Sequence, residues 1–331
     1  AYDHLKQKIT VIVNMKTNDL ENQYNKAIND IDEIVKMIND PTPVSKLTSY
    51  KDVEFKSNFT EEEYADTVNK TKEYIFDGDI FQAVISRRFE TKYEGSLLNA
   101  YRVLRVTNPS PYMVFMKIGE NEIISTSPET LVRYQNGRMT TFPIAGSRPR
   151  GKTEEEDIAL EKDLLQDEKE LSEHNMLVDL GRNDIGKISK FNSVTVTEYM
   201  KVLRYSKIMH ICSEVQSDAL DTVDSFDAIE AVLPAGTLSG APKVRACEII
   251  EELEKCPRGI YGGAIGYIDF NGNMDTCIAI RMASKIKDKV YVQAGGGIVA
   301  DSIPHNEYME SYNKALAVMN AIKNAGEVEE V

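Results

Sequence analysis

The sequence contains no tryptophan, only four cysteines and four histidines, and no apolar run of the length that a membrane-spanning helix requires. It also lacks a basic-then-apolar signal segment at its start. The cysteines form no C-x-x-C pair, which argues against a zinc ribbon or a redox motif. We therefore expect them to be free, reduced and mostly buried in a cytoplasmic protein; they are Cys212, Cys247, Cys256 and Cys277.

Positive charge is scarce as well. The chain has 39 Lys and Arg residues against 53 Asp and Glu residues, a formal net charge of −14. The basic residues are scattered, and this argues against nucleic acid and against an anionic membrane surface as partners. An acidic protein that handles an anionic small molecule must create positive potential locally, from a metal ion, a helix N-terminus or a few arginines.

The hydrophobic pattern predicts an α+β protein. Alternating segments separated by hairpin signals, such as Asn136-Gly137 and Asn271-Gly272, predict strands. Because the strands come in runs interrupted by long helices, we expect large, mostly antiparallel sheets forming a sandwich with the helices outside. The first residues read as a short strand, and the polar segment 41–59 reads as a loop or linker. Helical spacing predicts helices over 18–39, 60–76, 153–180, 223–233, 242–254 and 306–325.

Two pairs of glutamates have the same spacing. Glu170 and Glu173 in ELSEH, and Glu307 and Glu310 in EYMES, are three residues apart, so each pair lies on one side of its helix. Each pair alone is typical of a solvated helix face. Together the four carboxylates could hold a hard divalent cation, and Mg²⁺ suits them because it takes oxygen ligands and leaves positions open for substrate oxygens.

Three further features point to a bound anion. Arg281 lies in the apolar segment CIAIRMAS, where an arginine needs a partner such as a carboxylate. The three glycines of QAGGGI follow a strand and allow a ligand to approach the backbone, although they also fit a bulge or turn. His210, among apolar residues, fits a core histidine as well as a catalytic base. These features indicate a Mg²⁺ site that binds a small polycarboxylate.

Several motifs occur in the order seen in chorismate-binding enzymes, and the chain resembles this family from about residue 57 onward. Within the family, the similarity is greatest to the synthase component (component I) of anthranilate synthase. The motifs are PIAGSRPRG, ELSEHNMLVDLGRND, GTLSGAPKVRA, GIYGGAIGYID, DTCIAIR, VQAGGGIVADS and the final E-x-x-E.

The resemblance implies a site for Mg²⁺ and chorismate. It places the metal on Glu173 and Glu310, with Glu170 and Glu307 as water-mediated or alternate ligands. The enolpyruvyl carboxylate of chorismate would be held by Tyr261, Arg281 and the backbone at Gly295, Gly296 and Gly297. The resemblance also implies that Thr237 and Gly146 line the site. It places His210 near the leaving enolpyruvyl group and makes Glu129 a general acid.

The implied reaction is that of a lyase in tryptophan biosynthesis. Ammonia, delivered by a glutamine amidotransferase subunit, adds to chorismate, the ring hydroxyl leaves, and pyruvate is eliminated to give anthranilate. Related isochorismate synthases carry a lysine where Gln82 stands, and many aminodeoxychorismate synthases carry one where Ala145 stands. These two positions favour anthranilate, with aminodeoxychorismate synthase component I as the alternative enzyme and a catalytically silent, amidotransferase-binding scaffold as the alternative class.

The resemblance also predicts a domain organisation. We expect residues 57–326 to form the chorismate-binding catalytic domain and residues 1–56 to be the remnant of an N-terminal regulatory region with its linker. The family's Leu-Glu-Ser motif for tryptophan binding is absent from this sequence. The remaining half of that feedback site would consist of Pro111, Tyr112, Met113, Ile265 and Tyr267.

Overall fold

The computed structural model describes residues 1–41, 53–205 and 208–327, and it divides into two compact units, residues 1–47 and 48–331. The described part of the first unit contains a hairpin of two short strands, β1 (Tyr2–Asp3) and β2 (Lys8–Ile9), and the helix α1 (Leu20–Ile38). The helix predicted for 18–39 is therefore confirmed. Where a strand was expected at the start of the chain, the structure has only two exposed strands of two residues each. Of the loop predicted for 41–59, residues 42–52 lie outside the described residues.

The second unit is built on two seven-stranded sheets, and every pair of strands that is described in them is antiparallel. The first sheet consists of β3 (Lys56–Ser57), β4 (Gln82–Lys92), β5 (Tyr112–Ile118), β6 (Asn121–Ser127), β12 (Gly240–Ala241), β15 (Met282–Ile286) and β16 (Lys289–Ile298). The second consists of β7 (Thr130–Gln135), β8 (Arg138–Thr141), β9 (Ile144–Pro149), β10 (Thr195–Arg204), β11 (Ile208–Asp218), β13 (Ala264–Ile268) and β14 (Met274–Ile278).

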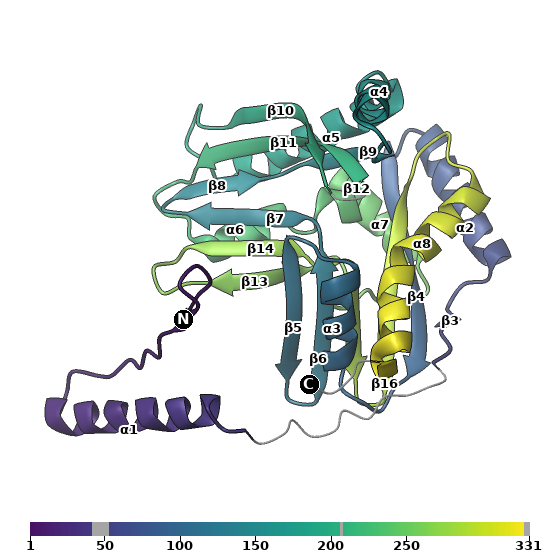
Figure 1. Ribbon diagram of the computed structural model, residues 1–331. Helices are drawn as coiled ribbons and strands as arrows, with labels where there is room; N and C mark the ends of the chain where they lie inside the picture. Colours follow the sequence, from purple (N-terminus) through teal and green to yellow (C-terminus); the bar gives the residue numbers. More distant parts are fainter. Residues whose placement is uncertain (42–52, 206–207, 328–331) are drawn as a thin grey trace. The chain divides into compact units, whose positions relative to one another are not determined.

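The strand order differs from the order along the chain. The first sheet runs β12-β4-β16-β15-β6-β5 with β3 beside β4, and the second runs β10-β11-β8-β7-β14-β13 with β9 beside β11. An apolar cluster joins the two sheets: Ile123 and Met282 of the first pack with Ile265 and Cys277 of the second. The strands of the two sheets cross one another (Figure 1).

Helices cover the outer faces of the sheets (Figure 1). Leu104 and Val318 pack their helices, α3 and α8, on the first sheet, and Val178 and Val232 pack α5 and α6 on the second. This arrangement confirms the predicted α+β fold of antiparallel sheets. The helices are α2 (Glu61–Phe76), α3 (Leu98–Thr107), α4 (Glu154–Leu164), α5 (Glu168–Gly186), α6 (Ser225–Val232), α7 (Lys243–Leu253) and α8 (Pro304–Lys323).

Local sequence signals explain where several helices begin. Thr60 and Glu63 form a capping box at the start of α2. The single helix predicted over 153–180 is wrong, because the chain forms α4 and α5 with a break between them. Thr153 caps α4 through the Glu156 N–H group, and Asp167 caps α5 through the N–H groups of Lys169 and Glu170. The new cap at Asp167 starts the helix that carries Glu170 and Glu173.

The glycine run also differs from its prediction. Gly295, Gly296 and Gly297 do not follow a strand but form the last part of β16, paired with Ser86, Ile85 and Val84 of β4. A Cβ atom on Gly295 would lie 2.9 Å from the Cα atom of Ser86, too close for any other residue. Glycine therefore lets β16 approach β4 closely.

Among the described residues, no helix combines the length and the apolar character needed to cross a membrane.

Candidate active site

The two glutamate pairs lie on two different helices, α5 and α8. On α8, Glu307 and Glu310 converge above the glycine run of β16. A Cβ atom on Gly296 would lie 3.0 Å from Glu307 Oε2 and 3.6 Å from Glu310 Oε1. The absence of a side chain at Gly296 therefore leaves a cradle between the strand and the two carboxylates.

On the other side of the site, Gly146 provides a similar opening beside α5. It is the extra residue of a β-bulge, because His210 of β11 pairs with Ser147 and Ile211 pairs with Ala145. Its φ of 70° favours glycine, and a Cβ atom there would lie 3.1 Å from Glu170 Oε2. The bulge brings the backbone of β9 against the first glutamate pair.

The four carboxylates form one electrostatic cluster. Burial is the main cause that raises the pKa of Glu170, Glu173 and Glu307 above the usual value of a glutamate. The negative charge of Glu310 raises the pKa of each of these three as well, and Glu170 does the same for Glu173. The fold thus brings together carboxylates from α5 and α8, two helices that are far apart in sequence. A bound cation would reduce the repulsion between their negative charges.

The donor set fits a hard cation that keeps water ligands. Within residues 1–41, 53–205 and 208–327, no group of three or more His, Cys, Asp or Glu side chains is arranged to hold a metal ion. Mg²⁺ does not need three protein ligands, because it is usually bound by one or two carboxylates, with waters and substrate oxygens as the other ligands. The carboxylate oxygens above Gly296 provide that kind of partial site.

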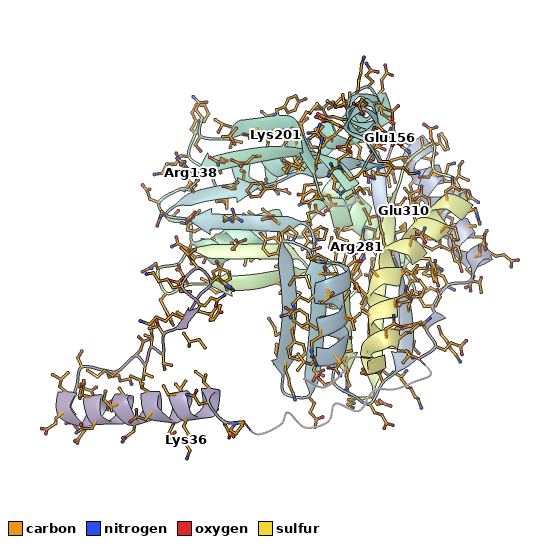
Figure 2. The ribbon with its side chains drawn as sticks, in the orientation of Figure 1. Lys36, Arg138, Glu156, Lys201, Arg281 and Glu310 are labelled. Atoms are coloured by element: carbon orange, nitrogen blue, oxygen red, sulfur yellow. The ribbon has the colours of Figure 1, made fainter. Side chains whose placement is uncertain are left out.

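Arg281 is a cation at the same site. It lies between β14 and β15 with a φ of 48°, and no hydrogen bond or ion pair of its guanidinium is found with the described residues. Burial lowers its pKa, while the nearby Tyr261, Glu310 and Glu129 act in the opposite direction. Figure 2 shows Arg281 and Glu310 in the middle of the unit, where the two sheets approach each other. An unpaired, largely enclosed guanidinium is suited to bind a carboxylate.

Tyr261 extends this anion-binding side towards the glycines. Its ring is buried in the core, and burial raises the pKa of its hydroxyl to about 12. The backbone N–H group of Gly295 donates a hydrogen bond to the tyrosine oxygen. Arg258 holds the segment in place: its guanidinium lies 5.8 Å from the centre of the Tyr261 ring and also donates to the carbonyl oxygen of Leu238. Tyr261 therefore lies near both Arg281 and the glycine run.

Glu129 and Thr237 form a second pair at the same site. Thr237 Oγ1 donates a hydrogen bond of 3.0 Å to Glu129 Oε1. Burial raises the pKa of Glu129 to about 7, whereas the Thr237 hydroxyl, Lys314 and Arg281 act to lower it. A carboxyl group with a pKa near 7 can hold a proton and give it up at neutral pH.

His210 is oriented by the β-bulge. Its Nδ1 atom lies 2.9 Å from the carbonyl oxygen of Gly146. A carbonyl oxygen only accepts hydrogen bonds, so Nδ1 carries the hydrogen and the neutral ring keeps a free lone pair on Nε2. His174, by contrast, is fully buried, and its Nε2 atom lies 2.6 Å from Ser213 Oγ, which gives it a structural role.

The two positions that distinguish related enzymes are both enclosed. Gln82 is 5% exposed and its side chain occupies the space beside Gly297, where a Cβ atom would collide with it. Among the described residues, no group donates a hydrogen bond to Gln82 Oε1. Ala145 is 9% exposed and precedes the bulge at Gly146. A buried amide oxygen without a donor is available to a ligand.

The residues predicted as half of a tryptophan site lie in and just before β5 and on β13. Tyr112 and Ile265 pack together in the core between the sheets, and Tyr112 donates a hydrogen bond of 2.7 Å to Asp275. Met113, on the opposite face of β5, packs into the core beneath α3 and α8. Pro111 and Tyr267 are exposed.

Two residues make contacts that the sequence analysis did not predict. Lys314 lies one turn after Glu310 on α8, and its ammonium group contacts both Glu310 and the carbonyl oxygen of Gly295. Asp184, at the end of the LGRND motif, binds Lys243 at the start of α7. The i, i+4 spacing of Glu310 and Lys314 was a sequence signal for the first contact; the second had none, because its partners are 59 residues apart.

A family model described as chorismate binding enzyme matches residues 1–320 of the chain. The chain belongs to the chorismate-binding enzyme family. This membership confirms the family predicted from the sequence motifs, and the site residues described above lie within the matched region of this chorismate-binding enzyme.

Individual relatives indicate which members of the family the chain is similar to. The chain is 53% identical to anthranilate synthase component 1 of Acetivibrio thermocellus and 50% identical to that of Aquifex aeolicus; each match covers 99% of the chain. The chain spans about two thirds of these relatives' lengths, 68% and 67%. A crystal structure of anthranilate synthase component I from Streptococcus pneumoniae TIGR4 shares the fold, with a TM-score of 0.87, 44% identity, and coverage of 96% of this chain and 71% of that one. These similarities favour anthranilate synthase component I over the alternative, aminodeoxychorismate synthase.

Proposed function

We propose that this chorismate-binding enzyme converts chorismate and ammonia to anthranilate and pyruvate. The observation that carries the proposal is the unpaired guanidinium of Arg281, enclosed beside Tyr261 and close enough to Glu129 and Glu310 for their charges to act on it. A cation in that position, near the glycine run of β16, is suited to one carboxylate of a small dianion. The cluster of four glutamates, through a divalent cation, is suited to the other.

Glu173 and Glu310 would hold Mg²⁺, with Glu170 and Glu307 in support through water. The metal would supply Lewis-acid stabilisation of negative charge on substrate oxygens, an effect worth several kcal/mol of barrier. Arg281, Tyr261 and the backbone of Gly295, Gly296 and Gly297 would hold the enolpyruvyl carboxylate. Gly146 and Thr237 would line the space between these two ends.

Two groups are proposed to move protons. Ammonia forms a bond to the ring, and the ring hydroxyl leaves as water once it takes up a proton, for which protonated Glu129 is the proposed donor. In the second step the bond between the ring carbon and the enolpyruvyl oxygen breaks and the ring loses a proton. The enolpyruvate that leaves takes up a proton on its methylene carbon and becomes pyruvate. His210 is the proposed base for this elimination because its Nε2 lone pair is free while Nδ1 is bound to Gly146.

The experiment is to incubate the chain with chorismate, MgCl₂ and ammonium chloride and to identify the product by fluorescence and chromatography. Anthranilate is expected. Isochorismate, 4-aminodeoxychorismate or unchanged chorismate would contradict the proposal. Calorimetry of chorismate binding with and without Mg²⁺ separates an inactive enzyme from a protein that does not bind the substrate, which is the outcome expected of a silent scaffold.

We also propose a glutamine amidotransferase subunit as the source of ammonia, because anthranilate synthase component 1 is named as one component of an assembly. A cytoplasmic location is in keeping with the four free cysteines, of which Cys212 and Cys277 are buried and Cys247 and Cys256 are partly exposed. The assignment of Pro111, Tyr112, Met113, Ile265 and Tyr267 to a tryptophan site stays a proposal. Tryptophan titration followed by calorimetry would test it.

A further inference from the structure

Lys314 contacts one member of the carboxylate cluster, Glu310. Its ammonium group lies 2.7 Å from Glu310 Oε1 and donates a hydrogen bond of 3.0 Å to the carbonyl oxygen of Gly295. The lysine side chain is 35% exposed and the glutamate side chain 49% exposed, so water reaches both groups. These contacts connect α8 to the glycine run at the point where the metal ligands converge.

The charge of Lys314 acts on more than its direct partner. It lowers the pKa of Glu129, Glu173 and Glu307, against the opposing effect of burial on all three. These residues come from the β6–β7 connection, α5 and α8, so the lysine faces carboxylates on each of these elements. A single positive charge therefore offsets part of the repulsion in the cluster.

This placement creates a conflict with metal binding. Glu310 is a proposed ligand of Mg²⁺, yet one of its oxygens is occupied by an ammonium group. Two cations at contact distance from the same carboxylate repel each other. Lysine is suited to give way, because its charge sits on a flexible four-carbon stem, and the carbonyl oxygen of Gly295 gives it a second partner.

We propose that Lys314 is the resident counter-ion of the metal site: its ammonium group pairs with Glu310 while no metal is bound and is displaced from Glu310 when Mg²⁺ binds. This inference rests on the proposed function, in which Glu310 is a metal ligand. The lysine keeps the four glutamates compatible with the folded protein before the metal arrives, and it weakens the affinity of the site for the metal.

The test is calorimetric titration of MgCl₂ into the chain without chorismate. Lys314→Met removes the charge but keeps the apolar stem, and we expect Mg²⁺ to bind roughly three- to tenfold more tightly than to the wild type, because a competing cation is gone. Lys314→Arg keeps the charge and should bind Mg²⁺ no more tightly than the wild type. Lys314→Gln provides a second neutral variant if the methionine variant folds poorly.

Lys323→Met is the matched control, since it removes the same charge from the same helix. Lys323 is exposed and lies 13 positions beyond Glu310 on α8, about 20 Å along the helix and beyond the screening length. Its Mg²⁺ affinity should equal that of the wild type. Unchanged or weaker Mg²⁺ binding by both neutral Lys314 variants would overturn the inference. Wild-type affinity in Glu310→Gln would overturn instead the assignment of Glu310 as a ligand.

Discussion

The Nδ1 atom of His210 lies 2.9 Å from the carbonyl oxygen of Gly146, on the neighbouring strand of the second sheet. The contact exists because the strand bulges at Gly146, whose φ of 70° turns its backbone out of the regular ladder. The same residue leaves room for Glu170. One glycine thus connects the orientation of the proposed base to the proposed metal site.

Replacement of His210 by alanine should lower kcat by about 10²–10⁴-fold, the usual contribution of an acid–base group. Mg²⁺ binding, measured by calorimetry, should remain unchanged, because the histidine is not a proposed ligand. His305→Ala is the control, since His305 is an exposed histidine on α8 that pairs with Glu61. Equal loss of activity in the two variants would argue against a catalytic role for His210.

The pH dependence should report on Glu129. Its pKa is about 7, so the proton that the proposed acid donates is lost as the pH rises through that value, and kcat/KM should fall on the alkaline side. The Thr237 hydroxyl donates to the ionised carboxylate and lowers its pKa, so Thr237→Val should move this fall to higher pH. Thr237→Ser keeps the hydroxyl and should leave the profile in place. A shift to lower pH in the valine variant would exclude the assignment.

The metal assignment predicts that Glu173→Gln and Glu310→Gln each lower Mg²⁺-dependent activity by at least about a hundredfold, since Lewis-acid stabilisation contributes several kcal/mol. Their melting temperatures should stay close to that of the wild type, because both side chains lie on helix surfaces facing the site. Glu168→Gln, at an exposed position on α5, is the control. Full activity in either ligand variant would disprove its role.

The LGRND motif should contribute to stability through Asp184. Asp184 is 5% exposed, and its carboxylate lies 2.7 Å from the Lys243 ammonium group, which also donates to the carbonyl oxygen of Val232. Asp184→Ala leaves a largely buried lysine without its counter-ion, and we expect the free energy of unfolding to fall by about 3 kcal/mol in urea titrations.

Asp179→Ala is the comparison for that measurement. The ion pair of Asp179 with Arg182 is exposed, with 73% and 52% of the two side chains accessible. Such pairs contribute about 0–1 kcal/mol. If both variants lose the same free energy of unfolding, the contact between Asp184 and Lys243 does not explain the motif's contribution to stability.

The sequence by itself determined the features that depend on neighbouring residues. The capping box at Thr60 and the three-residue spacing of the glutamates require only groups within one helical turn, so both were readable. The order of the motifs identified the family. The break at Asp167 could also have been read, because aspartate is a strong N-cap, but the continuous acidic pattern around it favoured one long helix.

Only the tertiary structure decided which of these features meet. Gly296 pairs with Ile85 across more than two hundred residues of chain, and Thr237 reaches Glu129 from a segment 108 residues away. The bulge at Gly146 and the contact between Lys314 and Gly295 depend in the same way on strand register and helix packing. Register is set by burying one face of each strand against the rest of the core, so no local pattern specifies it. The sequence supplied the chemical groups, and the packing of the two sheets with α5 and α8 placed them around one site.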